Sequence, residues 1–416
     1  MPYSSSRYEL WLSKMRAHLK EERYSTRTSL SHLAAARDFL MFLDTQRVEV
    51  EGARASSVER YLGHAERTYR RRHGRAPNDR TWRFRRSSGV HMLLRLVRGR
   101  WPPASVATTP AEILHKEIPE NYSRWMGDLR GLSPQTVEDR VVEANRFPGW
   151  VGECAVRERL GALTRLDVDL YMKDRAGSLH RRSVNGLATR LRSLLRFLYA
   201  TGQTMNDLAM TVIAPPVHAF EGIPSAMLPE GVGKVPEAAR QDGTAKGRRD
   251  YAILLLIAKY GVRAGEVTAL RLDDVDWRKE FIRIRHSKTG AMSCLPLLPD
   301  VGEALLNYLQ QSRPRTSFRE IFIRCQAPYR PFRNGSSLYG MVQWRLAAAN
   351  VVPIGKRGPH SFRHARAVSM LRASVPVKEI GDLLGHRAAD STLVYRKLAT
   401  GDLRAVAMEI PAGVKK

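Results

Sequence analysis

Six polar side chains lie in the C-terminal part of the chain, and their types suit the cleavage of a phosphodiester bond. Two arginines can hold the non-bridging oxygens of a phosphate and neutralise the charge that develops in the transition state. A lysine can protonate the departing 5′ oxygen, and histidines can donate to the phosphate or move a proton. A tyrosine can hold a covalent phosphoryl intermediate, so the set needs no metal ion. In chain order the six are Arg263, Lys288, His360, Arg363, His386 and Tyr395.

Each of these residues also has an ordinary structural explanation. A single arginine is usually a surface or salt-bridge residue, and a lysine in a hairpin is usually an exposed turn residue. A histidine at the start of a helix is more often a cap or a satisfied core residue than a catalyst. A tyrosine on an amphipathic helix usually packs in the core with its hydroxyl at the edge. Their combination, rather than any one of them, predicts the chemistry.

The apolar pattern predicts the elements that position these side chains. Arg263 directly follows a helix predicted at 249–260. Lys288 lies in the turn between strands predicted at 280–286 and 292–297, the first of which alternates isoleucine and arginine. Arg363 lies early in a helix at 361–373, and further helices are expected at 301–311, 337–348, 377–384 and 392–398. The expected fold class is therefore α+β, mostly α with a small antiparallel sheet.

Two segments of this region resemble the tyrosine recombinases, the family of the Xer recombinases and phage integrases. Residues 248–270 resemble that family's first arginine box and read R-R-D-Y-A-I-L-L-L-I-A-K-Y-G-V-R-A-G-E-V-T-A-L. The second box and the tyrosine segment are matched by H-S-F-R-H-A-R-A-V-S-M-L and I-G-D-L-L-G-H-R-A-A-D-S-T-L-V-Y. The order of the six residues agrees with the family, as does the spacing of nine residues from His386 to Tyr395. The likeness covers about 246–403, is weaker over 118–204, and nothing specific matches in the first 110 residues.

The resemblance implies a role for each residue. Arg263 and Arg363 would bind the scissile phosphate, while His360 and His386 would assist proton transfer and phosphate binding. Glu266, three residues after Arg263, would hold the arginine box.

The covalent step falls to the remaining two residues. Tyr395 would form a 3′-phosphotyrosine link, and Lys288 would be the general acid for the 5′-hydroxyl leaving group. Because the bond energy is stored in that link, neither ATP nor a divalent metal would be needed, and no cofactor is expected.

The chain departs from the family pattern at two positions that carry no catalytic group. Ser374 stands where the family usually has glycine, which suits a left-handed helix end better than serine does. Ala365 replaces a common small hydroxyl residue.

Breaks in the pattern predict the domain organisation. We expect an N-terminal helical domain at 1–110, a helical, SAM-like core-binding domain at 111–214, a linker at 215–233 and a catalytic domain at 234–416. The first domain should contain helices at 8–20, 26–44, 56–72 and 81–97, and the second at 122–129, 134–147, 167–173 and 179–200. Ser133 followed by Pro134 is a strong helix start, and Pro148-Gly149 should end or kink that helix.

The first two domains resemble each other, and the first could be a diverged copy of the second. An offset of 108 residues aligns them without a gap and pairs Ser25 with Ser133, Thr28 with Thr136, Ala36 with Ala144, Phe39 with Phe147 and Phe42 with Trp150. The alternative is that amphipathic helices look alike, and the sequence leaves both open.

The net charge of +28 indicates a polyanionic partner. Dispersed arginines on folded elements suit phosphate contacts, and the helix at 179–200 is the best candidate for them on the helical side. The alternative is a solvated basic face. The resemblance implies double-stranded recombination sites as the substrate, bound by a homo-tetramer or together with partner recombinases. The candidate DNA-binding residues are Arg181, Arg182, Arg190, Arg192 and Arg196.

The rest of the sequence bears on the cellular location and on the kind of recombinase. The three cysteines are far apart and form no metal-ligand pair, and they fit a reducing cytoplasm. No apolar run approaches the ~20 residues of a membrane span, and no signal peptide is evident. The N-terminal extension favours a recombinase of a mobile element, active in integration or transposition. Two alternatives remain open: a catalytically idle DNA-binding protein of this fold, and a related type IB topoisomerase or resolvase.

Overall fold

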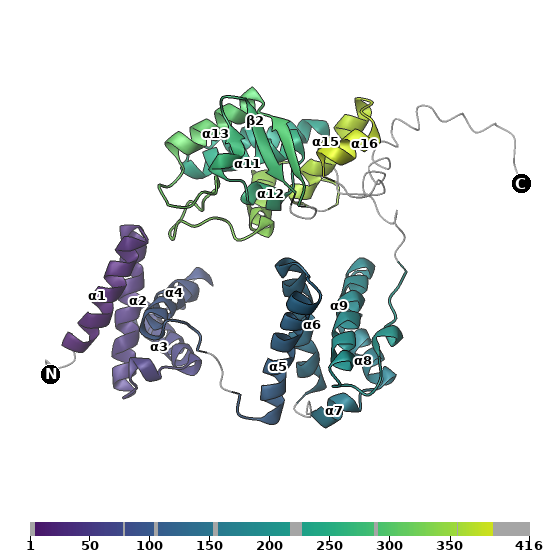
Figure 1. Ribbon diagram of the computed structural model, residues 1–416. Coiled ribbons are helices and arrows are strands. Elements are labelled where there is room, and N and C mark those ends of the chain that lie inside the picture. The colour runs from purple at the N-terminus through teal and green to yellow at the C-terminus, as the bar shows by residue number, and fades with distance from the viewer. Residues whose placement is uncertain are drawn as a thin grey trace, which may run out of the picture. The chain divides into compact units, whose positions relative to one another are not determined.

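A computed structural model describes residues 5–77, 80–103, 107–152, 157–216, 227–286, 290–355 and 357–385 (Figure 1). The described chain is mostly helical and contains one three-stranded antiparallel sheet with the strand order β1-β2-β3. The expected fold class is therefore confirmed. None of the helices in the described part combines the length and apolar composition of a transmembrane span.

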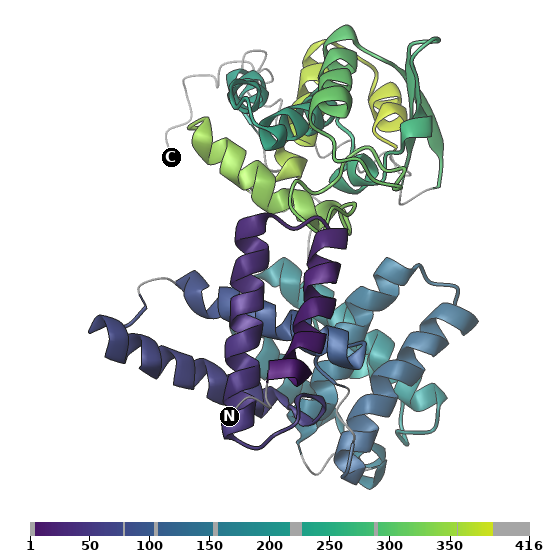
Figure 2. The ribbon, with the colours of Figure 1, turned by 90° about the vertical axis from the view of Figure 1, so that its left-hand side faces the viewer.

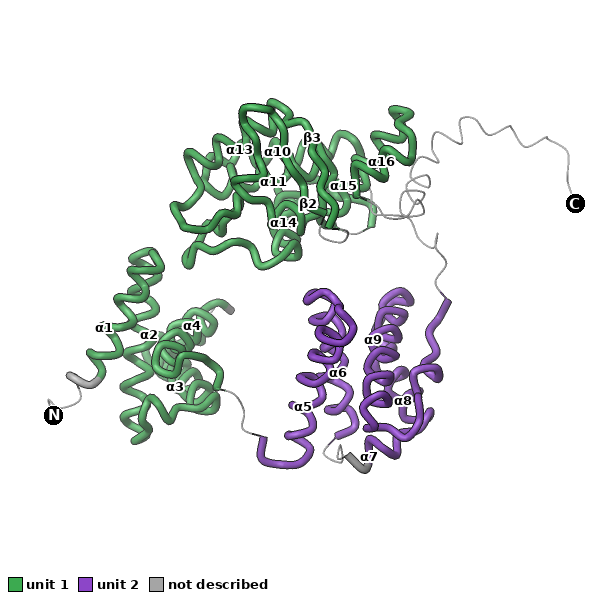
Figure 3. Tube along the Cα trace, in the orientation of Figure 1, with its two compact units in different colours: residues 1–103, 222–416 green, residues 104–221 purple. Residues whose placement is uncertain are grey.

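The chain divides into two compact units, one of residues 1–103 with 222–416 and the other of residues 104–221 (Figure 3). Separate apolar cores lie in residues 12–94, in 114–212 and in 227–384. We call the described parts around these cores the first module, the second module and the C-terminal domain.

The first module is a bundle of four helices. They are α1 (Ser5–Glu21), α2 (Thr26–Thr45), α3 (Ala55–His73) and α4 (Arg80–Arg98), with a 3-10 turn at Val50–Gly52. Helix α2 packs against both α1 and α4, and α1 and α2 run side by side (Figure 2). Fully buried Met15, Phe39 and Leu93 come from three of these helices and fill the core between them. The predicted helices match these bounds to within three residues.

The second module contains α5 (Pro110–Arg124), a π-helical turn (Trp125–Leu129), α6 (Pro134–Val151), α7 (Arg157–Gly161), α8 (Arg165–Ala176), α9 (Arg181–Ala200) and a 3-10 turn (Ala209–Thr211). The expected helix at 122–129 is only the end of a longer one. Helix α5 already begins at Pro110 because Thr109 caps it: its hydroxyl accepts from the Glu112 N–H, and the Glu112 carboxylate accepts from the Thr109 N–H. The short helix α7 was not predicted.

The expectation that Pro148 ends or kinks α6 near that residue is wrong about the end. The helix continues to Val151, and Pro148 is buried in the module core. The rings of Phe147 and Trp150 both pack edge-on against Tyr171, with centroid distances of 5.0 and 5.4 Å. This aromatic packing on both sides of the proline favours the helical path over an early end.

The helix starts that the repeat pairs have the same geometry. The backbone angles are φ −60° and ψ 148° at Ser25, and φ −61° and ψ 146° at Ser133. Each serine hydroxyl accepts from the N–H three residues on, at 3.3 Å from Thr28 and 3.4 Å from Thr136. In both caps the serine and threonine hydroxyl oxygens lie 2.9 Å apart.

The aromatic residues that follow these helix starts also occupy similar positions. The rings of Phe39 and Tyr61 meet edge-to-face at 5.3 Å in the first module. The rings of Phe147 and Tyr171 do so at 5.0 Å in the second. In each module the phenylalanine lies on the capped helix and the tyrosine on a later helix, although the offset of 108 residues does not pair the two tyrosines.

The C-terminal domain is built around one buried helix. It comprises α10 (Pro229–Gln241), α11 (Ala245–Tyr260), α12 (Ala264–Thr268), β1 (Val275–Asp276), β2 (Phe281–Arg285), β3 (Met292–Pro296), α13 (Pro299–Gln311), α14 (Tyr339–Ala348), α15 (Pro359–Arg372) and α16 (Val377–Leu383), with 3-10 turns at Leu272–Asp274 and Gly335–Leu338. Helix α11 is apolar on most faces and packs against α10, α13 and α15. The expected linker at 215–233 overlaps α10, because Pro229 takes the first position of that helix, where proline is favourable.

Strands β2 and β3 form the predicted hairpin. Ile282 faces Leu295 and Ile284 faces Ser293 across the ladder. Both isoleucines are buried, and Arg283 and Arg285 lie on the opposite face, as the alternation predicts.

Buried charges join α11 to α14. The Arg345 guanidinium is 1% exposed and donates to Asp250 at 2.9 and 3.0 Å and to Asp242 at 2.9 Å. Asp250 also accepts from Arg249 at 2.8 Å. Since every one of these charges has an opposite partner, the network can be buried without a bare ion.

Candidate active site

Arg263 begins helix α12 directly after the turn that ends α11. The turn contains Gly261 in the left-handed conformation (φ 66°), which reverses the chain. Arg263 is the N-cap residue of α12, and its own N–H donates to the Glu266 carboxylate at 2.8 Å. Its guanidinium donates through Nη1 to the same carboxylate at 2.8 Å and through Nη2 to the Gly385 carbonyl at 3.2 Å. The side chain is thus held at both ends of its guanidinium.

Glu266 has the holding role that the sequence predicted. Its side chain is fully buried. Burial by itself raises the pKa of Glu266, but hydrogen bonds from the Arg263 main chain and guanidinium and from His286 hold that pKa below its ordinary value. The carboxylate is therefore ionised and pairs with the arginine at neutral pH.

Arg363 lies in the first turns of α15, which starts with Pro359 after Gly358. It is only 3% exposed, and its guanidinium donates to the Gly261 carbonyl at 2.7 Å and to the Leu384 carbonyl. Both guanidinium groups therefore donate to carbonyls of one turn, at Leu384 and Gly385, directly before His386 in the sequence. Arg363 also donates to the carbonyl of Gly261, in the turn that directly precedes Arg263.

His360 and His364 lie one turn apart on α15, with ring centroids separated by 6.3 Å. His360 is exposed, as a group that meets a substrate must be. Burial, together with the neighbouring His360 and Arg363, lowers the pKa of His364 to about 4. His364 is therefore neutral at physiological pH.

Three of the six predicted residues, Lys288, His386 and Tyr395, lie outside the described residues. The structure brings Arg263 and Arg363 together and places His360 on the same helix as Arg363.

One residue at this place, His286, was not predicted from the sequence. Its ring is buried and hydrogen-bonded to Glu266 at 3.1 Å. The sequence does contain a sign of its importance, because a histidine two residues before Lys288 ends the alternation of isoleucine and arginine.

The arginines predicted to contact DNA on α9 fall into two groups. Arg190 approaches the buried Glu143 at 3.6 Å, and Arg192 donates to the Val212 carbonyl at 2.8 Å. Both are partly buried and make these contacts within the second module. The others, Arg181, Arg182 and Arg196, are exposed, and the DNA contacts of all five stay a prediction.

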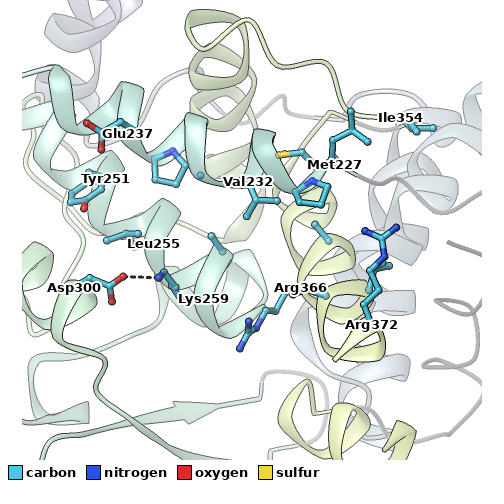
Figure 4. Close-up of a pocket in the computed structure, with 18 residues that line it drawn as sticks. Met227, Val232, Glu237, Tyr251, Leu255, Lys259, Asp300, Ile354, Arg366 and Arg372 are labelled. Carbon is cyan, nitrogen blue, oxygen red and sulfur yellow. Dashed lines mark ion pairs between the residues drawn. The ribbon is translucent and has the colours of Figure 1, made fainter. Parts of the chain in front are cut away.

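A cavity of about 590 Å³ opens between α10, α11 and α15 of the C-terminal domain (Figure 4). Its wall is apolar at Met227, Val232 and Leu255, and Lys259 pairs with Asp300 at 2.8 Å along one side. None of the described candidate catalytic residues lines it, so it is separate from the arginine pair.

Known proteins resemble the chain both in sequence and in fold. The model of the phage integrase family matches residues 232–401. The putative integrase/recombinase y4gC of Sinorhizobium fredii is 53% identical over 189 residues, which are 45% of this chain and 97% of that protein. The putative integrase/recombinase y4rA of the same organism is 35% identical over 291 residues, 70% of each chain.

Two solved structures share the fold. The XerH site-specific recombinase, solved bound to its difH substrate in a pre-cleavage complex, gives a TM-score of 0.52 at 13% identity and covers 72% of this chain and 98% of its own. A lambda integrase (75-356) dimer bound to a COC' core site gives 0.51 at 15% identity, covering 68% and 94%.

Proposed function

This chain belongs to the phage integrase family of tyrosine recombinases, and we propose that it cleaves and rejoins DNA strands at specific sites through a 3′-phosphotyrosine intermediate. The observation that carries the proposal is that Arg263 and Arg363 both donate to carbonyls of the turn at Leu384 and Gly385, which directly precedes His386 in the sequence.

The fixed guanidinium groups support a phosphate clamp. Hydrogen bonds to Glu266 and to main-chain carbonyls set the orientation of Arg263 and Arg363 before a substrate arrives. A preorganised cation needs no reorientation when negative charge develops on the non-bridging oxygens, and this is usually the largest electrostatic gain in such a site. His360, exposed one turn before His364, would donate to the same phosphate.

The reaction then balances without a cofactor. Tyr395 gives up its phenolic proton with the assistance of His360 and His386, and its oxygen attacks the phosphorus. The bond to the 5′ oxygen breaks, and Lys288 protonates that oxygen as it departs. Rejoining is the reverse, with a 5′-hydroxyl of the same or another strand displacing Tyr395. The phosphodiester energy stays in the covalent link, so neither ATP nor a metal ion is required.

The proposed substrate is a double-stranded recombination site, bound by a homo-tetramer or with partner recombinases in the cytoplasm. Support comes from the structural relatives, which were solved bound to a difH substrate and to a COC' core site, and from the exposed arginines of α9. We propose further that the first module is a diverged copy of the second, on the strength of their matching caps at Ser25 and Ser133.

A nicked suicide substrate tests the function. The duplex should carry the ends of the DNA element on which the gene lies, with the nick beside the cleavage position, in EDTA. We expect a covalent adduct with the native chain and none with Tyr395→Phe, while Tyr339→Phe, an exposed tyrosine of α14, serves as the control. An adduct that persists in Tyr395→Phe would refute the nucleophile.

The same reactions separate the alternatives. Binding without any adduct would indicate an idle DNA-binding protein. Relaxation of supercoiled plasmid without a site, and no strand exchange, would indicate a topoisomerase.

A further inference from the structure

We infer that His286 is a positioning residue of the proposed cleavage site, with a buried ring that joins the Glu266–Arg263 pair to the two strands flanking Lys288 in the sequence. The inference rests on the proposed function, because it concerns how that site is held together. His286 directly follows β2, is 2% exposed and comes two residues before Lys288.

One ring nitrogen faces the arginine box. Nδ1 of His286 lies 3.1 Å from Oε1 of Glu266, the same oxygen that accepts from Nη1 of Arg263 at 2.8 Å. An ionised carboxylate only accepts, so Nδ1 carries the proton and donates. The orientation of Glu266, and through it of Arg263, therefore depends partly on the imidazole.

The other ring nitrogen faces the returning strand. Nε2 of His286 lies 2.7 Å from Oγ of Ser293 on β3, one strand position beyond Met292. Main-chain hydrogen bonds also join the two sides of the hairpin at His286. The His286 N–H donates to the Ala291 carbonyl, and the Gly290 N–H donates to the His286 carbonyl, both at 2.8 Å. The base of the hairpin is thus fastened to the imidazole by a side chain as well as by the main chain.

One face of the ring lies against a third segment. A Cβ atom on Gly385 would come within 2.6 Å of Cγ and Nδ1 of His286, so only glycine leaves room for the imidazole there. Gly385 also has φ 62°, accepts from Arg263 at 3.2 Å and immediately precedes His386. His286 therefore contacts the three segments that contain Arg263, Lys288 and His386.

A buried histidine could instead only stabilise the hairpin, and the leaving group distinguishes the two roles. Lys288 is proposed to protonate the 5′ oxygen. A substrate with sulfur in the bridging 5′ position releases a thiolate, which needs no proton because thiols ionise far more readily than alcohols. A defect that arises from misplaced Lys288 should disappear with the sulfur substrate, whereas a general loss of structure should affect both substrates alike.

The test uses two mild variants that break the bond to β3. Ser293→Ala removes the hydroxyl, and His286→Asn keeps an N–H near the position of Nδ1 while losing Nε2. Single-turnover cleavage of the oxygen substrate by the full chain should fall about tenfold in each, since small misplacements of a catalytic group have effects of this size or greater. With the sulfur substrate each variant should come within about twofold of the native rate, as Lys288→Ala should.

The matched control is Cys294→Ala, the next residue on β3 and exposed, which should behave as the native chain on both substrates. Equal losses on both substrates, no loss on either, or a Lys288→Ala defect that sulfur does not restore would overturn the inference. If the native chain cleaves neither substrate, the proposed function itself fails, and the inference fails with it.

Discussion

Replacing Ser374 by glycine should stabilise the end of α15, because Ser374 has a backbone conformation that L-residues adopt at a cost. Its φ is 59°, in the left-handed region. The N–H of Ser374 donates to the Leu371 carbonyl and that of Val375 to the Met370 carbonyl, both at 3.0 Å, so the helix closes in the pattern that favours glycine at this position. The family pattern places glycine here as well.

The size of the effect follows from two opposing contributions. The left-handed conformation costs a residue with a Cβ atom roughly 1–2 kcal/mol. Glycine also gives the unfolded chain more conformational freedom, which lowers the free energy of unfolding by about 0.4–1 kcal/mol. The net gain should therefore be about 0.5–1 kcal/mol, which corresponds to a roughly two- to fivefold change in an opening equilibrium.

Hydrogen exchange measured by mass spectrometry on the intact chain can resolve this gain. Peptides from α15 should exchange roughly two- to fivefold more slowly in Ser374→Gly, while peptides from α9 in the same digest should not change. Ser374→Ala is the matched control, because it removes the hydroxyl and keeps the Cβ atom, and it should gain nothing. Equal protection in both variants would show that the hydroxyl, and not the backbone angle, carries the cost, and the reasoning would be refuted.

Three further predictions concern other parts of the chain. Ser25→Ala and Ser133→Ala should each destabilise their own module by about 1 kcal/mol, measured as faster exchange in α2 or α6; a loss at one site only would contradict their equivalence. His364 has a folded pKa of about 4, so above its ordinary value of 6.5 it is neutral in both states, and stability should fall as the pH falls from 6.5 towards 4 because only the unfolded chain takes up the proton. Because the ring is partly exposed, this loss of stability should be about 1–2 kcal/mol. Urea unfolding at pH 7.5 and 5 should give a smaller difference in the free energy of unfolding for His364→Gln than for the native chain; an unchanged difference would exclude His364 as the cause. Arg196→Ala should weaken duplex binding about equally for target and unrelated sequences in a gel-shift titration, whereas Arg192→Ala should chiefly destabilise the second module, and the reverse pattern would contradict their assignment.

Local features of the sequence predicted most of the elements that carry the site. The alternation around Ile282 and Ile284 identified the hairpin, since a period of two depends only on which face is buried. The helices before Arg263 and at Arg363 were found for a similar reason, because buried apolar residues recur along them. Ser374 could be recognised as a strained position because its cost is a property of the single residue.

Features that depend on distant partners could not be predicted in this way. Pro148 looked like a helix end, but packing around Tyr171 carries α6 past it. Arg192 donates to a main-chain carbonyl twenty residues away, a contact that its place on a basic helix did not indicate. The role of His286 depends on Glu266, which is also twenty residues distant and comes near only in the folded domain.

The buried charges around Arg345 affect how the protein responds to ionic strength. Dissolved ions screen exposed charges strongly, with a Debye length of roughly 3 Å at 1 M, but they screen buried pairs much less. Contacts between exposed arginines and a nucleic acid should therefore dissociate in concentrated salt, because binding releases counterions that salt drives back. The Arg345–Asp250 pair, 1% and 0% exposed, should stay closed under the same conditions. Salt should accordingly free the protein of nucleic acid without opening this buried pair.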